Sequence, residues 1–251
     1  MLFRSGGGGI SEDSRLDNSI KYRNKTSEFN YGLIYKMGGS NSANPGSGTA
    51  VNLGYTHGKM GVQVTYGRFS NSQKFDGTAV KLYDTESWML AARYKLTDAM
   101  TLKGGVQQYT LSSPTDLAAT FTSGLNYYGN SVSAANVKDG IASGQPSEKT
   151  LITFFGGDYD INAKTKVALA QYLIQPKSNK GDGGSQYNGT ISWTTFIVDY
   201  RINKYFDAYG ALAYVRFNGD QYDPSVNTTG LTATSYKNSN SVIGGGIRMK
   251  F

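Results

Sequence analysis

Regular alternation of apolar and polar residues is the feature that most limits how this chain can fold. In the segment 241–251, Ser, Ile, Gly, Ile, Met and Phe occupy every second position, and Arg248 and Lys250 lie between them. Successive side chains of a strand point to opposite faces, so a period of two predicts a β-strand with one apolar and one polar face. A half-buried strand of a soluble sheet would show the same pattern, so the other segments must decide.

The same alternation recurs in about eleven segments, roughly as long as tilted transmembrane strands. They are 18–22, 29–35, 51–55, 62–66, 88–96, 100–111, 151–159, 166–174, 192–201, 206–217 and 242–251. Aromatic residues gather on the apolar faces at both ends of these segments: Tyr22, Tyr55, Tyr94, Tyr159, Tyr200 and Phe251 at one end, and Tyr35, Tyr66 and Tyr214 at the other. Two aromatic bands separated by aliphatic residues are typical of a membrane barrel. The strand propensity of tyrosine explains its abundance but not this sorting.

The connections between the segments alternate in length. Short turns are predicted at 23–27, 57–61, 97–99, 162–165 and 203–205, and long polar loops at 38–48, 70–86, 112–148, 177–189 and 218–240. This order is typical of an up-and-down barrel with tight periplasmic turns and long extracellular loops, whereas Greek-key sandwiches mix their connection lengths. We therefore predict an all-β fold, a transmembrane antiparallel up-and-down β-barrel. Its apolar face meets lipid and its charged face lines a watery lumen.

Composition excludes several other classes of protein. The mean hydropathy is −0.42 and the longest apolar stretch is 151–155, so no transmembrane helix is expected. The chain has no cysteine and one histidine, His57, in a predicted turn, and it lacks P-loop, EF-hand and zinc-binding spacings. We expect no catalytic site, no metal, no cofactor and no enzyme activity. The net charge of +7 would suit nucleic acid, but RNA-binding sheets need aromatic and basic residues on one face, and here they alternate.

Several segments resemble general porins of the outer membrane of beta-proteobacteria. They are RLDNSIKY (15–22) with FNYGLIY (29–35), DYRIN (199–203) and GIRMKF (246–251). The resemblance implies a homotrimeric, sixteen-stranded channel in the bacterial outer membrane, in contact with the lipid bilayer and lipopolysaccharide. It also implies an inward-folded third loop and a preference for anions. Phe251 resembles the terminal signal that the outer-membrane assembly machinery reads.

The start of the chain departs from that family pattern. The long apolar segment of a signal peptide and roughly the first five strands of the pattern are missing. On this interpretation residues 1–17 are a remnant of the inward-folded constriction loop, and residues 18–251 carry about eleven of the family's sixteen strands. The first and last of these strands run in the same direction, so pairing them would require a parallel pair. We predict a curved, incompletely closed sheet with a gap between 18–22 and 242–251.

The face predicted to line the lumen is mostly basic. Charged residues of this phase are Lys21, Arg23, Lys36, Arg93, Lys95, Lys103, Arg201, Arg248 and Lys250, against Asp158, Asp199 and Asp207. Charged rings at a narrow point set the ion preference of a channel. The candidate pore-lining residues are therefore Lys21, Arg23, Arg93, Lys95, Lys103, Arg201 and Arg248, opposed by Glu12 and Asp13 on the loop remnant.

These features together favour a general diffusion porin that passes small hydrophilic solutes and ions, preferably anions, without chemistry or energy coupling. Two alternatives stay open on the sequence. One is an outer-membrane adhesin or receptor that acts through its long loops, and the other is a soluble all-β carbohydrate-binding module. Single-channel conductance separates the first alternative from a porin, and the need for detergent separates the second.

Overall fold

The structure is a computed structural model of the whole chain. It describes residues 18–38, 46–75, 78–111, 125–127, 130–132, 148–177, 179–180, 186–187, 189–219 and 238–249. The predictions for residues 1–17, including Glu12 and Asp13, and for Lys250 and Phe251 lie outside these ranges. No helix in the described part is long and apolar enough to cross a membrane.

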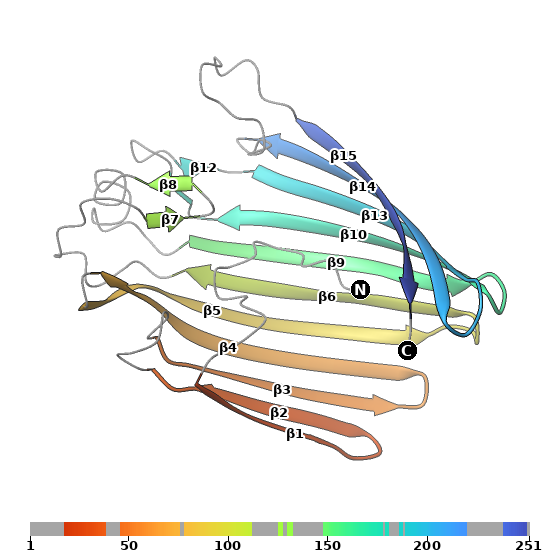
Figure 1. The fold of residues 1–251 in the computed structure, drawn as a ribbon, viewed down its shortest axis with the longest axis horizontal. Coiled ribbons are helices and arrows are strands. Elements are labelled where there is room, and N and C mark those ends of the chain that lie inside the picture. The colour runs from red at the N-terminus through yellow and green to blue at the C-terminus, as the bar shows by residue number, and fades with distance from the viewer. Residues whose placement is uncertain are drawn as a thin grey trace.

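One large sheet of eleven strands dominates the fold (Figure 1). Its strands are β1 (Ser19–Lys25), β2 (Phe29–Lys36), β3 (Gly48–His57), β4 (Met60–Phe75), β5 (Thr78–Lys95), β6 (Met100–Leu111), β9 (Glu148–Asp160), β10 (Thr165–Lys177), β13 (Gly189–Arg201), β14 (Phe206–Gly219) and β15 (Ser239–Met249). Each strand pairs antiparallel with the next one along the chain within this sheet. The predicted up-and-down order of eleven strands is confirmed.

Two short hairpins form separate two-stranded sheets outside the large sheet, and neither was predicted. They are β7 (Leu125–Tyr127) with β8 (Asn130–Val132), and β11 (Asn179–Lys180) with β12 (Gln186–Tyr187). Both fall within connections that the sequence assigned to long loops. Their strands are two or three residues long, too short for a period of two to be recognised.

The short turns and the long connections lie at opposite rims of the sheet. Figure 1 shows the turns that join β1–β2, β3–β4, β5–β6, β9–β10 and β13–β14 at one end. The same capping device recurs in four of these turns, where a side-chain oxygen accepts the backbone N–H three residues later. The pairs are Thr26 with Phe29 (3.1 Å), Thr97 with Met100 (3.0 Å), Asn162 with Thr165 (2.9 Å) and Asn203 with Phe206 (3.0 Å). Asn and Thr compete for local backbone N–H groups, which favours chain reversal at these positions.

The predicted loop at 70–86 is wrong, because β4 and β5 continue through most of it as a paired hairpin. The ladder runs to Phe75 and Thr78, with a register shift between Asn71 and Ser72. Arg68 Nη2 donates to Asp84 Oδ2 (3.0 Å) and Ser70 Oγ donates to Asp84 Oδ1 (2.7 Å), so polar side chains tie the two strands together. A strand that extends beyond the membrane needs no apolar face. The alternation of apolar and polar residues therefore ends before the hydrogen-bonded strands end.

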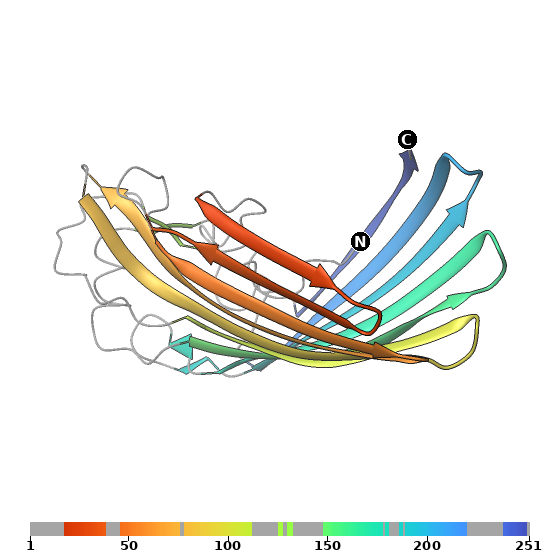
Figure 2. The ribbon, with the colours of Figure 1, turned by 90° about the horizontal axis from the view of Figure 1, so that it is seen from below.

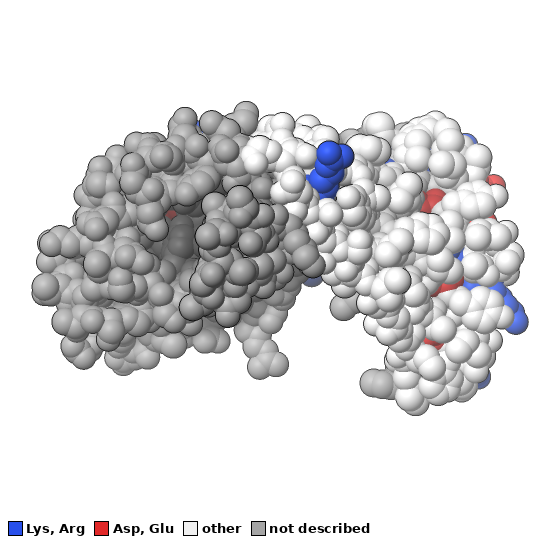
Figure 3. All heavy atoms as spheres, turned by 90° about the horizontal axis from the view of Figure 1, so that it is seen from above, with Lys and Arg blue, Asp and Glu red and all other residues white. Residues whose placement is uncertain are grey.

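The sheet curves into a trough (Figure 2). Its two faces differ in the exposure of their side chains. Side chains converge on the concave face, where Ile152 is fully buried and Val215 and Phe217 are at most 9% exposed. The convex face exposes aliphatic and aromatic side chains on every strand: Ile20, Leu33, Val51, Val64, Leu90, Leu102, Phe155, Leu169, Phe196, Leu212 and Ile243. Seen from above, uncharged residues dominate the described surface (Figure 3). An apolar outer surface of this extent indicates contact with lipid rather than water.

Aromatic residues border this convex surface at both rims, as predicted. Near the short turns, four tyrosine side chains are about half exposed: Tyr22, Tyr94, Tyr159 and Tyr200. Toward the long connections, four aromatic side chains are similarly exposed: Tyr35, Tyr66, Trp88 and Tyr214. Amphipathic aromatic rings are favoured at the two water–lipid interfaces. The convex face therefore has the layered composition of a membrane-spanning wall.

The sheet is not closed. β1 and β15 form its two edges, and no pairing joins them among the described residues (Figure 2). Both strands end at the short-turn rim, as the sequence predicts. The predicted gap between residues 18–22 and the final strand is confirmed for the part of that strand, up to Met249, that the structure describes.

Candidate pore-lining site

Strand register places every described candidate pore residue on the concave face. Lys21 heads one row across the sheet, opposite Ile34, followed by Ala50, Gly67 and Ser87 on successive strands. Arg23 heads the next row, with Gly32, Asn52 and Thr65. Facing residues of antiparallel strands share a face, so these rows follow from the ladder. The concave face of the other strands carries the remaining candidates: Arg93, Lys95, Lys103, Arg201 and Arg248.

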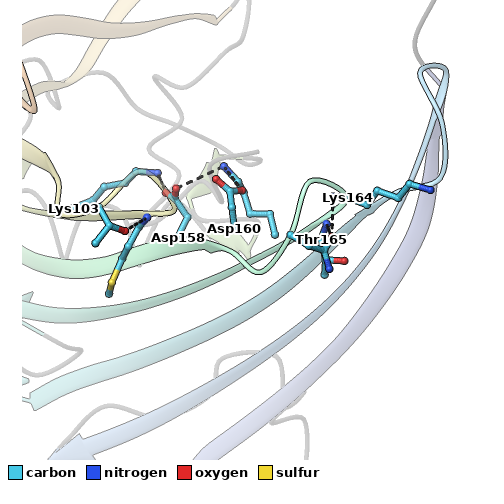
Figure 4. Close-up of polar contacts among 9 residues, drawn as sticks. Lys103, Asp158, Asp160, Lys164 and Thr165 are labelled. Carbon is cyan, nitrogen blue, oxygen red and sulfur yellow. Dashed lines mark hydrogen bonds and ion pairs between the residues drawn. The ribbon is translucent and has the colours of Figure 1, made fainter.

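Ion pairs neutralise three of the four described concave-face cations on β6–β15, and Arg201 is the exception. Lys103 on β6 pairs with Asp158 on β9, and Lys166 on β10 lies 3.7 Å from Asp158 and 3.3 Å from Asp160. Figure 4 shows that Lys103, Asp158 and Asp160 project from the same side of the sheet. We call these four residues, Lys103, Asp158, Asp160 and Lys166, the Asp158 cluster. Sequence reasoning missed Lys166 and Asp160, although both have the lumen phase of their strands.

A second pairing site lies near the β15 edge. Arg248 pairs with Asp199 of β13, two strands away, and its guanidinium lies 3.9 Å from Asp207 of β14. The Arg248 Cζ atom also lies 5.3 Å from the ring centroid of Tyr209. Arg248 therefore lies on the predicted lumen face, and its ion pairs leave it little free charge.

Three candidate cations on β1–β5 are not neutralised in this way, whereas Lys95 at the end of β5 pairs with Asp98. Lys21, Arg23 and Arg93 make no ion pair within the described part of the chain. Arg93 lies over a glycine on the neighbouring strand, since a Cβ on Gly61 would be 2.9 Å from Arg93 Nε. Glycine at this position leaves room for the guanidinium to lie along the wall. The concave face is thus divided into a cationic half and an ion-paired half.

Lys95 and Arg201 lie toward the rim of short turns. Lys95 Nζ is 2.9 Å from Asp98 Oδ1 in the turn after β5. The hydrogen bond and positive charge of Lys95 lower the pKa of the Asp98 carboxyl. Arg201 is the last residue of β13 and is exposed, with no ion pair in the described region. Both residues line the mouth of the trough rather than its middle.

His57 lies on the convex face at the turn rim, away from the charged wall. Its Nδ1 atom is 2.5 Å from Glu28 Oε1, and the two side chains are 69% and 41% exposed. No group of three His, Cys, Asp or Glu side chains in the described ranges is placed to hold a metal ion.

An up-and-down antiparallel sheet with an apolar, aromatic-bordered outer face and a charged inner face defines a class, the outer-membrane β-barrels. A family model described as Gram-negative porin matches residues 2–220. The chain belongs to this family, and it is a porin of the bacterial outer membrane. No curated protein matches the sequence closely enough to count as a relative.

Solved structures share the fold at low sequence identity. OmpT, an outer membrane protein of Vibrio cholerae folded in vitro, superposes with a TM-score of 0.60 at 13% identity, over 92% of this chain and 63% of that one. An anion-selective porin from Comamonas acidovorans has a TM-score of 0.59 at 15% identity, over 92% of this chain and 59% of that one. The chain thus spans about three fifths of the length of these structures.

Proposed function

We propose that this chain forms part of the wall of a general diffusion porin, which passes small hydrophilic solutes and ions without a chemical step. The observation that carries the proposal is the contrast between the two faces of one sheet. The convex face is apolar between two aromatic borders, and the concave face carries the charged side chains of the candidate pore residues that the structure describes. A wall with lipid on one side and water on the other is what a diffusion channel requires.

Anion preference is the finer part of this proposal, and Lys21, Arg23 and Arg93 support it. Because pairing neutralises Lys103 and Arg248, the positive potential along the path comes mainly from these three residues on β1 and β5. Charges farther apart than about 8 Å are screened at physiological salt, so only cations that line the narrow part of a channel select strongly. A solved structure of the same fold is an anion-selective porin, which supports the same assignment.

The assembly of the channel is proposed from the sequence resemblance. We infer a homotrimer in the outer membrane, surrounded by lipid and lipopolysaccharide, with residues 1–17 as the inward loop that carries Glu12 and Asp13 toward the basic wall. In the same proposal Phe251 is part of the signal read by the assembly machinery. Chemical cross-linking of the outer-membrane protein tests the homotrimer, and a ladder that ends at a dimer would contradict it.

Planar bilayer recordings test the function. Channels that contain this chain, purified from outer membranes, should conduct, and their reversal potential in a salt gradient should have the sign of anion preference. A cation-preferring or unselective channel would overturn the preference and leave the porin function intact. Absence of conductance in properly inserted protein would overturn the porin function itself and favour a barrel that binds partners through its loops.

A further inference from the structure

The cationic half of the concave face contains a hollow of about 270 Å³ over β1–β5. Three small residues form its floor: Gly32 on β2, Ala50 on β3 and Gly67 on β4. A row of large side chains would fill this space. The volume is just below the range of about 300–1,000 Å³ that is usual for ligand pockets, so the hollow suits only a small solute.

Two free cations border the hollow on the β1 side. Lys21 and Arg23 both line it and neither has an ion-pair partner in the described part of the chain. The Arg23 side chain extends over β2, because a Cβ on Gly32 would lie 3.5 Å from Arg23 Cγ. A free guanidinium and a free ammonium at one end of a small hollow suit a carboxylate or a phosphate.

Three uncharged polar side chains also line the hollow, together with apolar residues such as Ile34. Asn52, Thr65 and Ser87 line it from β3, β4 and β5. Asn52 lies against Gly32, since a Cβ there would be 2.5 Å from Asn52 Oδ1, and Ser87 Oγ accepts a hydrogen bond from Gln107 Nε2 (3.2 Å). Strands lie about 4.8 Å apart, which places Asn52, Thr65 and Ser87 roughly 10, 14 and 19 Å from β1. Because Arg23 covers part of that span, a ligand of about five or six carbons held by the cations would reach Asn52 and Thr65, whereas Ser87 is too far away.

We propose that this hollow is a subsite for a small polyhydroxylated anion, such as a sugar acid or a sugar phosphate. The anionic group contacts Lys21 and Arg23, and the hydroxyls exchange hydrogen bonds with Asn52 and Thr65. The inference rests on the proposed porin function and adds a substrate class to it. Binding is weak, with Kd on the order of 1 mM, because a conducting site must also release its solute.

Cysteine accessibility tests the subsite, because the natural chain contains no cysteine. Ala50→Cys places one thiol in the floor of the hollow without removing a proposed ligand contact, and Ala168→Cys on β10 places a matched thiol on the ion-paired half of the same face. The full chain in detergent is labelled with an anionic and a cationic methanethiosulfonate reagent, after circular dichroism has verified its β-structure. The two reagents differ in intrinsic reactivity, so the ratio of the anionic to the cationic rate is compared between the two positions. This ratio should be about fivefold higher at position 50 than at position 168, the factor that one nearby charge gives in water.

Ligand protection then separates the subsite from a general charge effect. Gluconate at 20 mM should slow labelling of Ala50→Cys at least threefold, while sodium chloride of equal ionic strength should not, and Ala168→Cys should be unaffected by either. Thr65→Val should reduce protection by gluconate toward the level given by acetate, which has no hydroxyl groups, and Ser87→Ala, beyond the reach of the ligand, is the matched control. Glucose 6-phosphate in place of gluconate tells whether phosphate is accepted as well as carboxylate.

Two results would overturn the inference in different ways. Equal protection by gluconate and chloride, together with a higher ratio of anionic to cationic labelling at position 50, would exclude the subsite and leave the proposed anion preference intact. Equal ratios of the anionic to the cationic labelling rate at positions 50 and 168 would contradict the cationic wall itself, and with it the proposed anion preference.

Discussion

The cations of the concave face differ in what lies beside them, and this difference determines their effect on ions in the pore. Lys103 shares the Asp158 cluster with Lys166, whereas Lys21 and Arg93 face water. A mobile anion interacts with the net charge within a Debye length of about 8 Å, not with single side chains. Paired cations therefore contribute far less to selectivity than their number suggests.

The first prediction compares free and paired cations. Lys21→Glu with Arg93→Glu should shift the reversal potential of the outer-membrane channel toward cations, and the shift should exceed that of Lys103→Glu with Arg248→Glu, although both double variants change the charge equally. Planar bilayer recordings in a potassium chloride gradient measure it. Equal shifts for the two pairs would show that ion pairing does not reduce the influence of Lys103 and Arg248.

The second prediction concerns the carboxylate of the Asp158 cluster. Asp158→Asn should increase anion preference, because it leaves Lys103 without its ion-pair partner at little change in side-chain volume. Asp98→Asn removes the same charge in a fully exposed turn and is the matched control, with an expected shift near zero. An equal shift for both variants in the same recordings would indicate that only net charge matters.

The strands and turns follow from local chemistry that can be read in the sequence. The period of two identifies the strands that cross the membrane, because lipid on one side and water on the other impose it. The outer half of the β4–β5 hairpin lacks that contrast, so the alternation fails although the ladder continues. The ion pairs could not be predicted from the sequence either. Lys103 and Asp158 are 55 residues apart in the chain, and only the register of β6 and β9 brings them together.

The turn caps give the third prediction. Asn162 Oδ1 accepts hydrogen bonds from the backbone N–H groups of Lys164 and Thr165, both at 2.9 Å. Asn162→Ala should lower the free energy of unfolding by about 1 kcal/mol, whereas Asn162→Asp, which keeps the acceptor, should stay within a few tenths of the natural protein. Lys164→Ala in the same turn is the control, since the Lys164 side chain is exposed. Urea titrations of protein in lipid vesicles measure the effect, and equal losses for the Ala variants would contradict the capping role.

At the scale of the whole molecule, the direction of the edge strands determines how the barrel can close. β1 and β15 both run toward the rim of short turns and form the two edges of the sheet. Joining them directly would create a parallel pair, which bacterial up-and-down barrels avoid by having an even number of strands. An odd number of further strands between the two edges would make every pair antiparallel.

The open edges give the fourth prediction, that the 251-residue chain alone does not form a stable channel. No further strand of the described part pairs with β1 or β15 at its outer edge, and hydrocarbon penalises each unpaired N–H or C=O group by several kcal/mol. Stable insertion therefore requires strands that cover both edges. The isolated chain, refolded in detergent and added to planar bilayers, should give rare and irregular conductance, and a version in which an odd number of antiparallel strands joins β15 to β1 should give stable steps. Regular porin-sized steps from the isolated chain, or a hydrogen-bonded ladder between β1 and β15 detected by NMR, would show that the chain closes by itself and that the antiparallel rule does not hold here.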